Sequence, residues 1–440
     1  MKVAVVGSGI AGLTAAHRLA PHTALTLFES GSYFGGHTHT VDVALPVDGV
    51  DTVHGVDTGF LVYNERTYPH LIALFKELGV ETARSDMSFS VQFGASGTGR
   101  ALEWSGSSLS TVFAQRRNLL NPPFLGMLRD LLRFNALTTR LAESPLDAAM
   151  QQPLGEFLRE HRFGKAFCDW YFLPMMACIW SCPTAQMLQF PVATMIRFCH
   201  NHGLLQVSNR PQWWTVRGGA RNYVDRILAH VVDKRLHTPV RSIHRHAAGG
   251  GGVLLATDAG TEHFDKVIIA THSDQALALL ADATPAERQC LGAIRFHRNR
   301  AVLHTDASVL PSRKAAWAAW NYESAPPVGG VGAQDNQVCL HYLINLLQPV
   351  PWSQPVVVSL NPLRAIERAN ILGEFDYAHP VFDADAIQAQ GDMARLQGVS
   401  GTYFSGAWLG YGFHEDGVKS GDAAARHILD TLHQTAGAHP

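Results

Sequence analysis

Apolar and polar positions alternate in blocks over residues 1–30. The apolar run Val3–Val6 ends at a glycine, a helical pattern follows, and a second apolar run, Leu25–Phe28, leads to the carboxylate of Glu29. Short apolar runs bounded by turn residues are typical of buried parallel strands, and a helix between two of them predicts a β-α-β unit. The beginning of the chain therefore predicts an α/β fold with a Rossmann-like sheet.

The rest of the pattern predicts helices up to about residue 205 and mixed strands after it. A helix is expected over Tyr68–Leu78, closed by Gly79, within a largely helical unit at 61–205. The later expectations are five strands, a buried strand, a loop and a closing helix, in this order: Val240–Arg245, Val253–Thr257, Phe264–Ala270, Arg300–His304, Val338–Leu346, Gly401–Gly406, Ala407–Lys419 and Gly421–Leu432.

The turn after the first strand has the spacing G-x-G-x-x-G, from Gly7 to Gly12. Gly7 permits the tight turn, Gly9 lets the backbone approach a pyrophosphate, and Gly12 lets the helix pack closely on the sheet. Glu29 lies about 20 residues further on, where an acid takes the ribose hydroxyls. The pattern indicates nucleotide binding, and by itself it fits an NAD-dependent dehydrogenase almost as well as a flavoprotein.

Composition limits the class of protein. The chain has 440 residues, of which 46% are hydrophobic and 16% charged, and its formal net charge is −2. This length favours two packed domains, and the charge gives no electrostatic reason to expect nucleic acid as a partner. The first twenty residues lack the features of a signal peptide, and the apolar stretch Tyr171–Cys182 is too short to span a bilayer. We expect a cytoplasmic protein.

Cysteine and histidine spacing predicts no metal site. The six cysteines are too sparse for a disulfide framework, and Cys178 and Cys182 lie in an apolar run without a second ligand pair. The 23 histidines include no H-E-x-x-H or comparable ligand spacing.

Glycine-rich segments far apart in the sequence suggest one domain built from several pieces. A second turn contains Gly35-Gly36-His37, directly after the second strand, and Arg217-Gly218-Gly219 precedes another helix. We therefore expect a discontinuous cofactor domain at 1–60, 210–275 and 400–435, with a substrate domain of helices and a mixed sheet at 61–209 and 276–399. Ligands in such folds bind where the two parts meet, beyond the carboxyl ends of the strands.

Together these motifs resemble the superfamily of flavin-containing amine oxidases and phytoene desaturases. The segment Gly406–Gly421 resembles a narrower branch, which includes the flavoprotein domain of plant cyclopropane-fatty-acid synthases and bacterial flavoproteins linked to fatty acyl desaturation. The resemblance implies FAD as the cofactor, with His37 in the place of the usual arginine. It implies these cofactor-binding residues: Gly7, Gly9, Ile10, Ala11, Gly12, Glu29, Ser30, Gly35, Gly36, His37, Gly59, Arg217, Gly218, Gly219, Val240, Gly406, Glu415, Asp416 and Gly417.

The same resemblance places three candidate proton acceptors, Tyr411, His414 and Glu415, beside the flavin ring. A helix that starts near Gly417 would direct backbone N–H groups at the ring. Capping of that helix is the alternative role for Glu415 and Asp416. Gly406-Ala407 replaces the Gly-Glu of ordinary amine oxidases, so the resemblance favours another substrate.

The expected activity is FAD-dependent removal of hydride from a lipid, such as a fatty acyl chain, leaving a double bond. Oxidation of a C–N bond in an amine, isomerisation of a double bond, and a non-catalytic role beside a lipid methyltransferase are the alternatives. The aromatic residues near Trp170–Trp180 suit an acyl tunnel or an ordinary core. Arg116 and Arg117, next to apolar residues as far as Leu128, suggest peripheral membrane contact.

Overall fold

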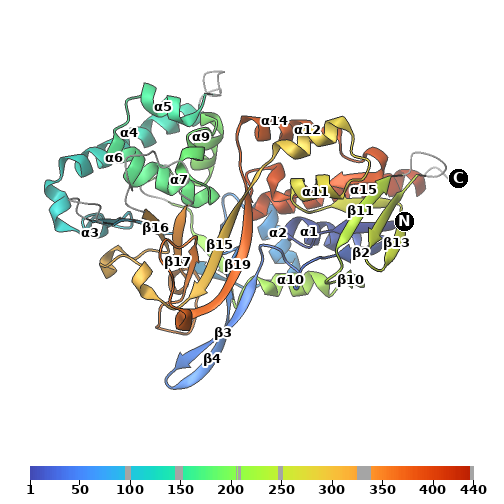
Figure 1. Ribbon diagram of the computed structural model, residues 1–440, viewed down its shortest axis with the longest axis horizontal. Helices are drawn as coiled ribbons and strands as arrows, with labels where there is room; N and C mark the ends of the chain where they lie inside the picture. Colours follow the sequence, from blue (N-terminus) through green and yellow to red (C-terminus); the bar gives the residue numbers. More distant parts are fainter. Residues whose placement is uncertain are drawn as a thin grey trace.

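The computed structural model describes residues 1–94, 101–143, 152–204, 206, 210–245, 251–324 and 338–436. A parallel sheet with its helices lies on one side of the molecule, and helices α3 to α9 lie on the other (Figure 1). Strands of a large mixed sheet run between them. This arrangement confirms the mixed α/β class that the sequence predicted.

The parallel sheet is assembled from three distant parts of the sequence. Its strand order is β10-β2-β1-β14-β20, and every neighbouring pair is parallel. The apolar runs of the first thirty residues form its centre, because both faces of β1 are covered. In sheet order the strands are β10 (Asp233–Arg235), β2 (Ala24–Phe28), β1 (Lys2–Val6), β14 (Lys266–Ile269) and β20 (Thr402–Phe404).

One expected strand proves to be two. The segment Phe264–Ala270 divides at Asp265, where β13 (Gly260–Phe264) ends and β14 begins. Strand β13 completes an antiparallel sheet with β11 (Val240–Arg245) and β12 (Val253–Thr257), whereas β14 pairs with β1. Asp265 fixes the change of partner, because the Lys2 backbone N–H donates to its carboxylate at 2.6 Å and its own N–H donates to the Lys2 carbonyl.

The large sheet has seven strands, of which only β16 and β7 form a parallel pair. In sheet order they are β19 (Ile371–Pro380), β15 (Phe296–His304), β18 (Val357–Leu360), β17 (Cys339–Leu343), β16 (Trp320–Ser324), β7 (Phe89–Phe93) and β8 (Leu102–Ser105). The strand expected over Val338–Leu346 is shorter, because a helical turn, α13 (Ile344–Leu347), begins at Ile344.

A helical unit covers one face of this sheet, and both contribute to the largest hydrophobic core. The unit was expected to begin at residue 61, but four short strands, β5 (Tyr63–Asn64), β6 (Thr82–Ser85), β7 and β8, lie before it with one helix, α2 (Pro69–Leu78), among them. The largely helical part therefore begins at Leu109. None of the helices in the described ranges combines the length and hydropathy needed to cross a membrane. The helices of this unit are α3 (Leu109–Val112), α4 (Pro122–Glu143), α5 (Leu154–Glu160), α6 (Lys165–Phe167), the π-helix Cys168–Phe172, α7 (Leu173–Trp180), α8 (Thr184–Met187) and α9 (Val192–Asn201).

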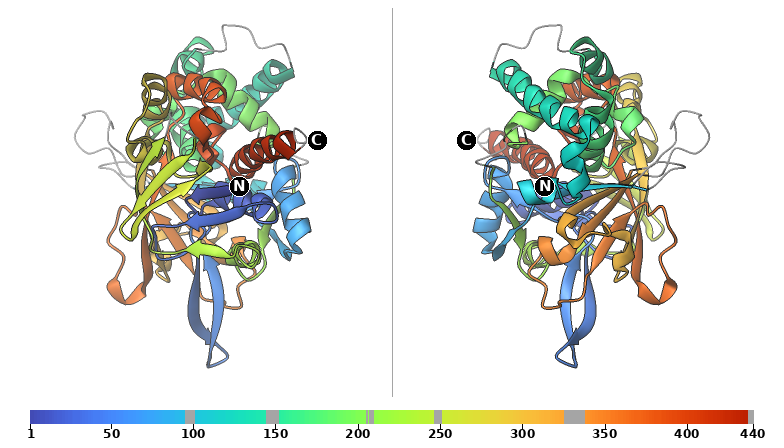
Figure 2. Two further views of the ribbon diagram at one scale, coloured as in Figure 1. Left: turned by 90° about the vertical axis from the view of Figure 1, so that its right-hand side faces the viewer. Right: turned by 90° about the vertical axis from the view of Figure 1, so that its left-hand side faces the viewer.

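A hairpin and several shorter strands and helices complete the fold. A long hairpin, β3 (Thr40–Val47) and β4 (Val50–Asp57), projects from the body (Figure 2). The expected helix α2 (Pro69–Leu78) is present and ends at Gly79, whose φ of 66° is left-handed. The remaining elements are β5 (Tyr63–Asn64), β6 (Thr82–Ser85), β9 (Trp213–Val216), α10 (Arg221–Leu228), α11 (Ser273–Leu279), α12 (Pro285–Ala293) and α14 (Ala384–Asp392).

The C-terminal helix starts earlier than the sequence predicted. The segment Ala407–Lys419 was expected to be a loop, but α15 (His414–Ala436) includes its second half. The N–H groups of Asp416 and Gly417 both donate to the Phe413 carbonyl, which starts the helical hydrogen bonding. Glycines are poor helix formers, and the several glycines here concealed the helix in the sequence.

Candidate functional site

The first glycine turn lies where β1 meets α1 (Ile10–Leu19), at the carboxyl edge of the parallel sheet. Gly7 has a φ of +101°, and a Cβ on it would lie 2.7 Å from the Ala270 carbonyl oxygen; a Cβ on Gly12 would lie 1.9 Å from the Gly7 carbonyl oxygen. Around the Cβ position of Gly9 there is open space, and no side chain caps the helix that follows. The N-terminal N–H groups of α1, from Ile10 onward, therefore suit an anionic ligand.

Glu29 lies at the end of β2, beside this turn. Its carboxylate accepts hydrogen bonds from the Ser8 N–H at 3.0 Å, the Ser8 hydroxyl at 2.5 Å and the Gly31 N–H at 2.7 Å. The Ser30 hydroxyl lies 3.5 Å from the same carboxylate. The acid thus has a fixed position at the strand edge where nucleotide riboses bind.

The second glycine turn contacts the first. A Cβ on Gly36 would lie 3.1 Å from the Gly9 Cα, and the Gly35 N–H donates to the Ser8 hydroxyl at 3.1 Å. Gly35 and Gly36 both have positive φ, at 129° and 59°. Gly59 approaches the same turn, because a Cβ on it would lie 2.2 Å from the His37 carbonyl oxygen. The backbones of the two glycine turns therefore lie in contact with each other.

His37 extends from this turn into a group of half-buried histidines beside the buried Tyr377. Its ring centroid lies 5.0 Å from that of Tyr377, 5.2 Å from His379 and 6.2 Å from His272. Burial and the neighbouring histidines hold the pKa of His37 well below its usual value, so the ring is neutral. Its ring hydrogen-bonds the Ala378 backbone, and its Nε2 is buried without a partner in the described structure, so Nε2 suits a ligand that offers a hydrogen-bond donor.

His414 is enclosed by protein side chains. Its Nε2 lies 3.0 Å from the Thr38 hydroxyl and 3.2 Å from the Tyr223 hydroxyl, and its ring stacks on Phe60 at 3.7 Å. Burial lowers the pKa of His414 to about 3. A neutral imidazole in this setting joins the second glycine turn, α10 and α15.

Glu415 caps a helix, but not the one expected. One carboxylate oxygen accepts from the backbone N–H of His70 at 3.1 Å and from its ring, and the other accepts from the Leu71 N–H at 3.0 Å. These donors lie in the first turn of α2, so Glu415 ties α15 to that helix. Both of its oxygens accept hydrogen bonds from α2, and its role as a proton acceptor stays a prediction.

Asp416 shapes the turn before α15. Its carboxylate accepts from the N–H groups of Tyr411 at 3.0 Å and Phe413 at 3.1 Å. Burial raises the pKa of Asp416 to about 6, against the lowering effect of these two donors. The side chain therefore fixes the backbone at Tyr411, whose own pKa is raised by burial.

Helix α15 crosses α1 through glycines. A Cβ on Gly417 would lie 2.5 Å from Cγ2 of Ile10, and one on Gly421 would lie 2.2 Å from the Ala11 carbonyl oxygen. Before the helix, the Gly406 N–H donates to the Ser420 hydroxyl at 3.0 Å. The two N-terminal halves thus lie against each other at the open side of the first glycine turn.

The remaining predicted residues take up more peripheral positions. The Arg217 side chain is exposed and lies 4.0 Å from Glu81. Gly218 and Gly219, with positive φ, pack their backbone against the β3–β4 hairpin. Val240 begins β11, and the Glu29 carbonyl accepts from Thr238 two residues earlier. Gly218, Gly219 and Val240 border the site through backbone, whereas the Arg217 side chain does not join it.

Asp57 is a buried carboxylate that the sequence analysis did not single out. It accepts hydrogen bonds from the Thr40 hydroxyl at 2.5 Å, the Ala220 N–H at 2.9 Å and the Gln348 side-chain amide at 2.9 Å. Burial raises its pKa to about 7. Gln348 follows α13, between β17 and β18 of the large sheet, so Asp57 connects the first part of the chain to that sheet. The position of Asp57 at the end of a strand was the available signal in the sequence.

Aromatic side chains of the helical unit contact the turn before α15. The Phe198 ring stacks on Phe413 at 5.1 Å and lies 4.5 Å from Trp180, whose Nε1–H donates to the Tyr411 carbonyl at 3.3 Å. His202 stacks on Phe198 at 3.9 Å. We call Trp180, Phe198, Tyr411 and Phe413 the aromatic wall. It joins the apolar helical unit to the turn before α15.

Comparison with known proteins agrees with this geometry. The family model for flavin containing amine oxidoreductases matches residues 10–302. A carotenoid phi-ring synthase from Streptomyces griseus is 29% identical over 338 residues, which cover 71% of this chain and 59% of that protein.

Solved structures share the fold over almost the whole chain. Cyclohexylamine oxidase from Brevibacterium oxydans aligns with a TM-score of 0.69 at 16% identity, covering 98% of this chain and 99% of that one. The CLA-producing fatty acid isomerase from P. acnes aligns with a TM-score of 0.64 at 15% identity, covering 97% and 98%. At these identities the likeness concerns the fold.

Proposed function

Because this chain belongs to the flavin containing amine oxidoreductase family and is an FAD-dependent oxidoreductase, we propose that it removes hydride from a carbon of a lipid. The substrate in this proposal is a fatty acyl chain, and the product carries a new double bond. FAD, when bound, supplies the acceptor for the hydride. The chain itself must hold the cofactor, hold the acyl chain and exclude water.

We assign the holding of FAD to the two glycine turns and their neighbours. The α1 N-terminus at Gly9 takes the pyrophosphate, Glu29 takes the ribose hydroxyls, and the unpartnered Nε2 of His37 accepts a hydrogen bond from a donor on the cofactor. In this proposal residues 1–60, 210–275 and 400–435 form the cofactor domain, and residues 61–209 and 276–399 form the substrate domain.

The aromatic wall is the observation that carries the lipid proposal. It brings apolar side chains of α7 and α9 directly onto the turn at Tyr411–Phe413, which leads into the helix beside the first glycine turn. Apolar surfaces bind acyl chains by excluding water. Aromatic rings also attract a cationic amine, so the amine alternative is kept as an outcome of the test. Ala407, in the place where the resemblance puts a glutamate, supports the same choice.

The names of two similar proteins support a lipid as well. One is a carotenoid phi-ring synthase and the other a fatty acid isomerase, and both names refer to long apolar molecules. The cyclohexylamine oxidase supports the alternative of amine oxidation. The isomerase supports the alternative in which a double bond moves without net oxidation.

Of the three candidate proton acceptors, we keep Tyr411 as a catalytic candidate. His414 and Glu415 already bind protein partners through Nε2 and both carboxylate oxygens, so we assign them positioning roles. Tyr411 lies in the aromatic wall, partly exposed, with its backbone held by Asp416. Because burial raises its pKa, its hydroxyl keeps its proton, so it would relay the proton that accompanies loss of hydride onward to solvent.

Anaerobic mixing of the purified yellow protein with fatty acids, phospholipid vesicles and primary amines tests the proposal. Lasting bleaching of the flavin absorbance by a lipid is expected, with a new double bond detected in the extracted lipid by mass spectrometry. Bleaching by amines alone would overturn it. Transient bleaching with recovery in the absence of an acceptor indicates an isomerase, and bleaching only after a lipid methyltransferase is added indicates a partner protein.

We further propose that the segment from α3 to the first half of α4 contacts the membrane where such lipids reside. Five large apolar side chains are exposed there, and Leu109 and Leu120 are 80% and 89% exposed. Arg116 and Arg129 are exposed among them. Exposed leucines with neighbouring arginines suit an anionic bilayer surface.

A further inference from the structure

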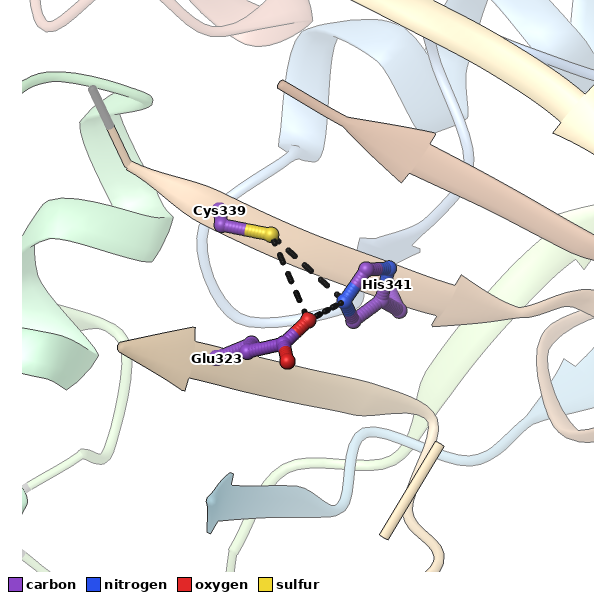
Figure 3. A group of neighbouring side chains, drawn as sticks. All are labelled: Glu323, Cys339 and His341. Atoms are coloured by element: carbon purple, nitrogen blue, oxygen red, sulfur yellow. Dashed lines mark hydrogen bonds and ion pairs between the residues drawn. The ribbon is translucent and has the colours of Figure 1, made fainter. Parts of the chain in front are cut away.

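Three side chains that commonly bind metals gather on the large sheet, away from the glycine turns. Glu323 lies on β16, and Cys339 and His341 lie on β17 (Figure 3). The His341 Nε2 is 2.9 Å from a Glu323 carboxylate oxygen and 3.5 Å from the Cys339 sulfur, which is 4.0 Å from that oxygen. Cys339 and His341 are buried, and Glu323 is nearly so.

Strand geometry explains why the three residues meet. Cys339 and His341 are two positions apart on one strand, so their side chains point to the same face. Glu323 is the direct antiparallel partner of Cys339. The face they share is opposite to the one bearing Tyr322 and Leu340, which belong to the core beneath the helical unit.

We propose that Glu323, Cys339 and His341 bind a zinc ion. With typical bond lengths and tetrahedral angles, zinc needs its sulfur, nitrogen and oxygen ligands about 3.4–3.6 Å apart. The three distances of 2.9, 3.5 and 4.0 Å bracket that range, so shifts of about half an ångström complete the geometry. Thiolate, imidazole and carboxylate together favour zinc over magnesium or calcium.

The surroundings of the cluster already orient two of the ligands. The Ser359 hydroxyl lies 2.6 Å from the other ring nitrogen of His341, and Arg364 donates to the second oxygen of Glu323 at 3.1 Å. Metal-bound histidines and carboxylates have such outer partners. Ser359 would accept the Nδ1–H of His341 and leave Nε2 for the metal, and Arg364 would leave one carboxylate oxygen for it.

Without metal, one hydrogen-bond chain satisfies the same groups. The Asp306 N–H donates to Nδ1 of His304 at 3.1 Å, so His304 donates from Nε2 to Ser359 at 2.7 Å. Ser359 then donates to His341, whose Nε2–H donates to Glu323. Zinc binding moves the His341 proton from Nε2 to Nδ1, and the hydrogen of the Ser359 hydroxyl turns away from His341 so that its oxygen accepts this proton. An S–Zn bond replaces the S–H bond of Cys339, and the thiol proton is released to solvent.

The test uses the full-length holoprotein, equilibrated with zinc and then passed through a desalting column. We expect about one zinc per chain by elemental analysis, with an X-ray absorption spectrum that fits one sulfur among nitrogen and oxygen ligands. Retention of no zinc, or a spectrum without sulfur, would overturn the proposal. Both measurements use the unmodified protein, so they do not depend on a variant that folds.

Variants then assign the ligands. Cys339→Ser should lose the bound zinc, whereas Cys290→Ser, at a buried thiol on α12, should keep it. Ser359→Ala should weaken zinc binding by about 10- to 100-fold, because His341 loses its outer partner. The flavin-to-protein absorbance ratio monitors folding of each variant. If Cys339→Ser retains its flavin and also as much zinc as the unmodified protein, the site is wrong.

Discussion

Gly421 of α15 faces the backbone of Ala11 in α1 so closely that a Cβ on the glycine would lie 2.2 Å from the Ala11 carbonyl oxygen. Neither the carbonyl nor the helix that carries it can move without disturbing the first glycine turn. This crossing therefore links the last helix of the chain to the proposed pyrophosphate site at its beginning.

Gly421→Ala should lower both stability and cofactor content. Overpacking at a buried contact costs about 1–3 kcal/mol, and here the nearest atom is backbone. Thermal unfolding and the flavin-to-protein absorbance ratio measure the two effects. Gly391→Ala in α14 is the matched control, because nothing lies within 4 Å of its Cβ position, so alanine should be neutral or stabilise by up to about 1 kcal/mol. Equal behaviour of the two variants would contradict the crossing.

His414 should make the protein sensitive to acid. Its pKa is about 3 in the folded chain and about 6.5 when unfolded, so the unfolded chain binds the extra proton first. The free energy of unfolding should therefore fall as the pH drops from about 6.5 toward 3, and His202 and His379, with pKa values of about 4, act in the same direction.

Thermal unfolding of His414→Gln across this pH range tests the assignment. The variant should lose less stability on acidification than the unmodified protein, while the exposed His22→Gln should follow the unmodified curve. Flavin reduction by substrate should slow by much less than the 10²–10⁴-fold typical of a lost general base. Parallel pH curves, or such a large kinetic loss, would count against a positioning role.

Removal of the Glu415 carboxylate should weaken the start of α2. Glu415→Ala leaves the His70 and Leu71 N–H groups without their acceptor and should cost about 0.5–2 kcal/mol. Glu415→Gln keeps one acceptor oxygen and should lose less. If Glu415 were the catalytic base, Gln would abolish flavin reduction even in a folded holoprotein, so the anaerobic reduction rate of this variant decides between the two roles.

Membrane contact should depend on the exposed leucines of the α3–α4 segment. Leu120→Asp should reduce flotation with anionic vesicles, since burial of one leucine contributes about 1.5–3 kcal/mol. Arg116→Glu should weaken binding most at low salt, where charges are least screened. Val232→Asp is the control, because Val232 is 99% exposed but follows α10 on the other side of the molecule. Failure of the unmodified protein to float ends this proposal.

The structure of the first glycine turn could be predicted from residues that are close together in the sequence. The apolar run, the three glycines and the helix after them have the geometry that their spacing predicted, because each requirement involves neighbours along the chain. Gly7 needs a positive φ and Gly12 needs room above Gly7. Both needs are visible as the absence of a side chain.

The prediction of a loop over Ala407–Lys419 was wrong in its second half, because contacts with residues far away in the sequence decide the structure there. One of its glycines, Gly417, meets Ile10 of α1, about four hundred residues away in sequence, and serves a helix crossing. Capping of its own helix was the alternative role for Glu415, but the N–H groups that it caps belong to α2. Contacts between residues far apart in the sequence decided both the start of α15 and the helix that Glu415 caps.

The sequence by itself determined the α/β class, the order of strand, glycine turn and helix, and the carboxylate at Glu29, since these depend on periodicity and on residues close in the chain. Only the tertiary structure decided which partners occupy His414 and Glu415, and that Cys339 and His341 lie beside Glu323 across two paired strands. Strand register and helix crossings set those contacts, and neither leaves a fixed spacing in the sequence.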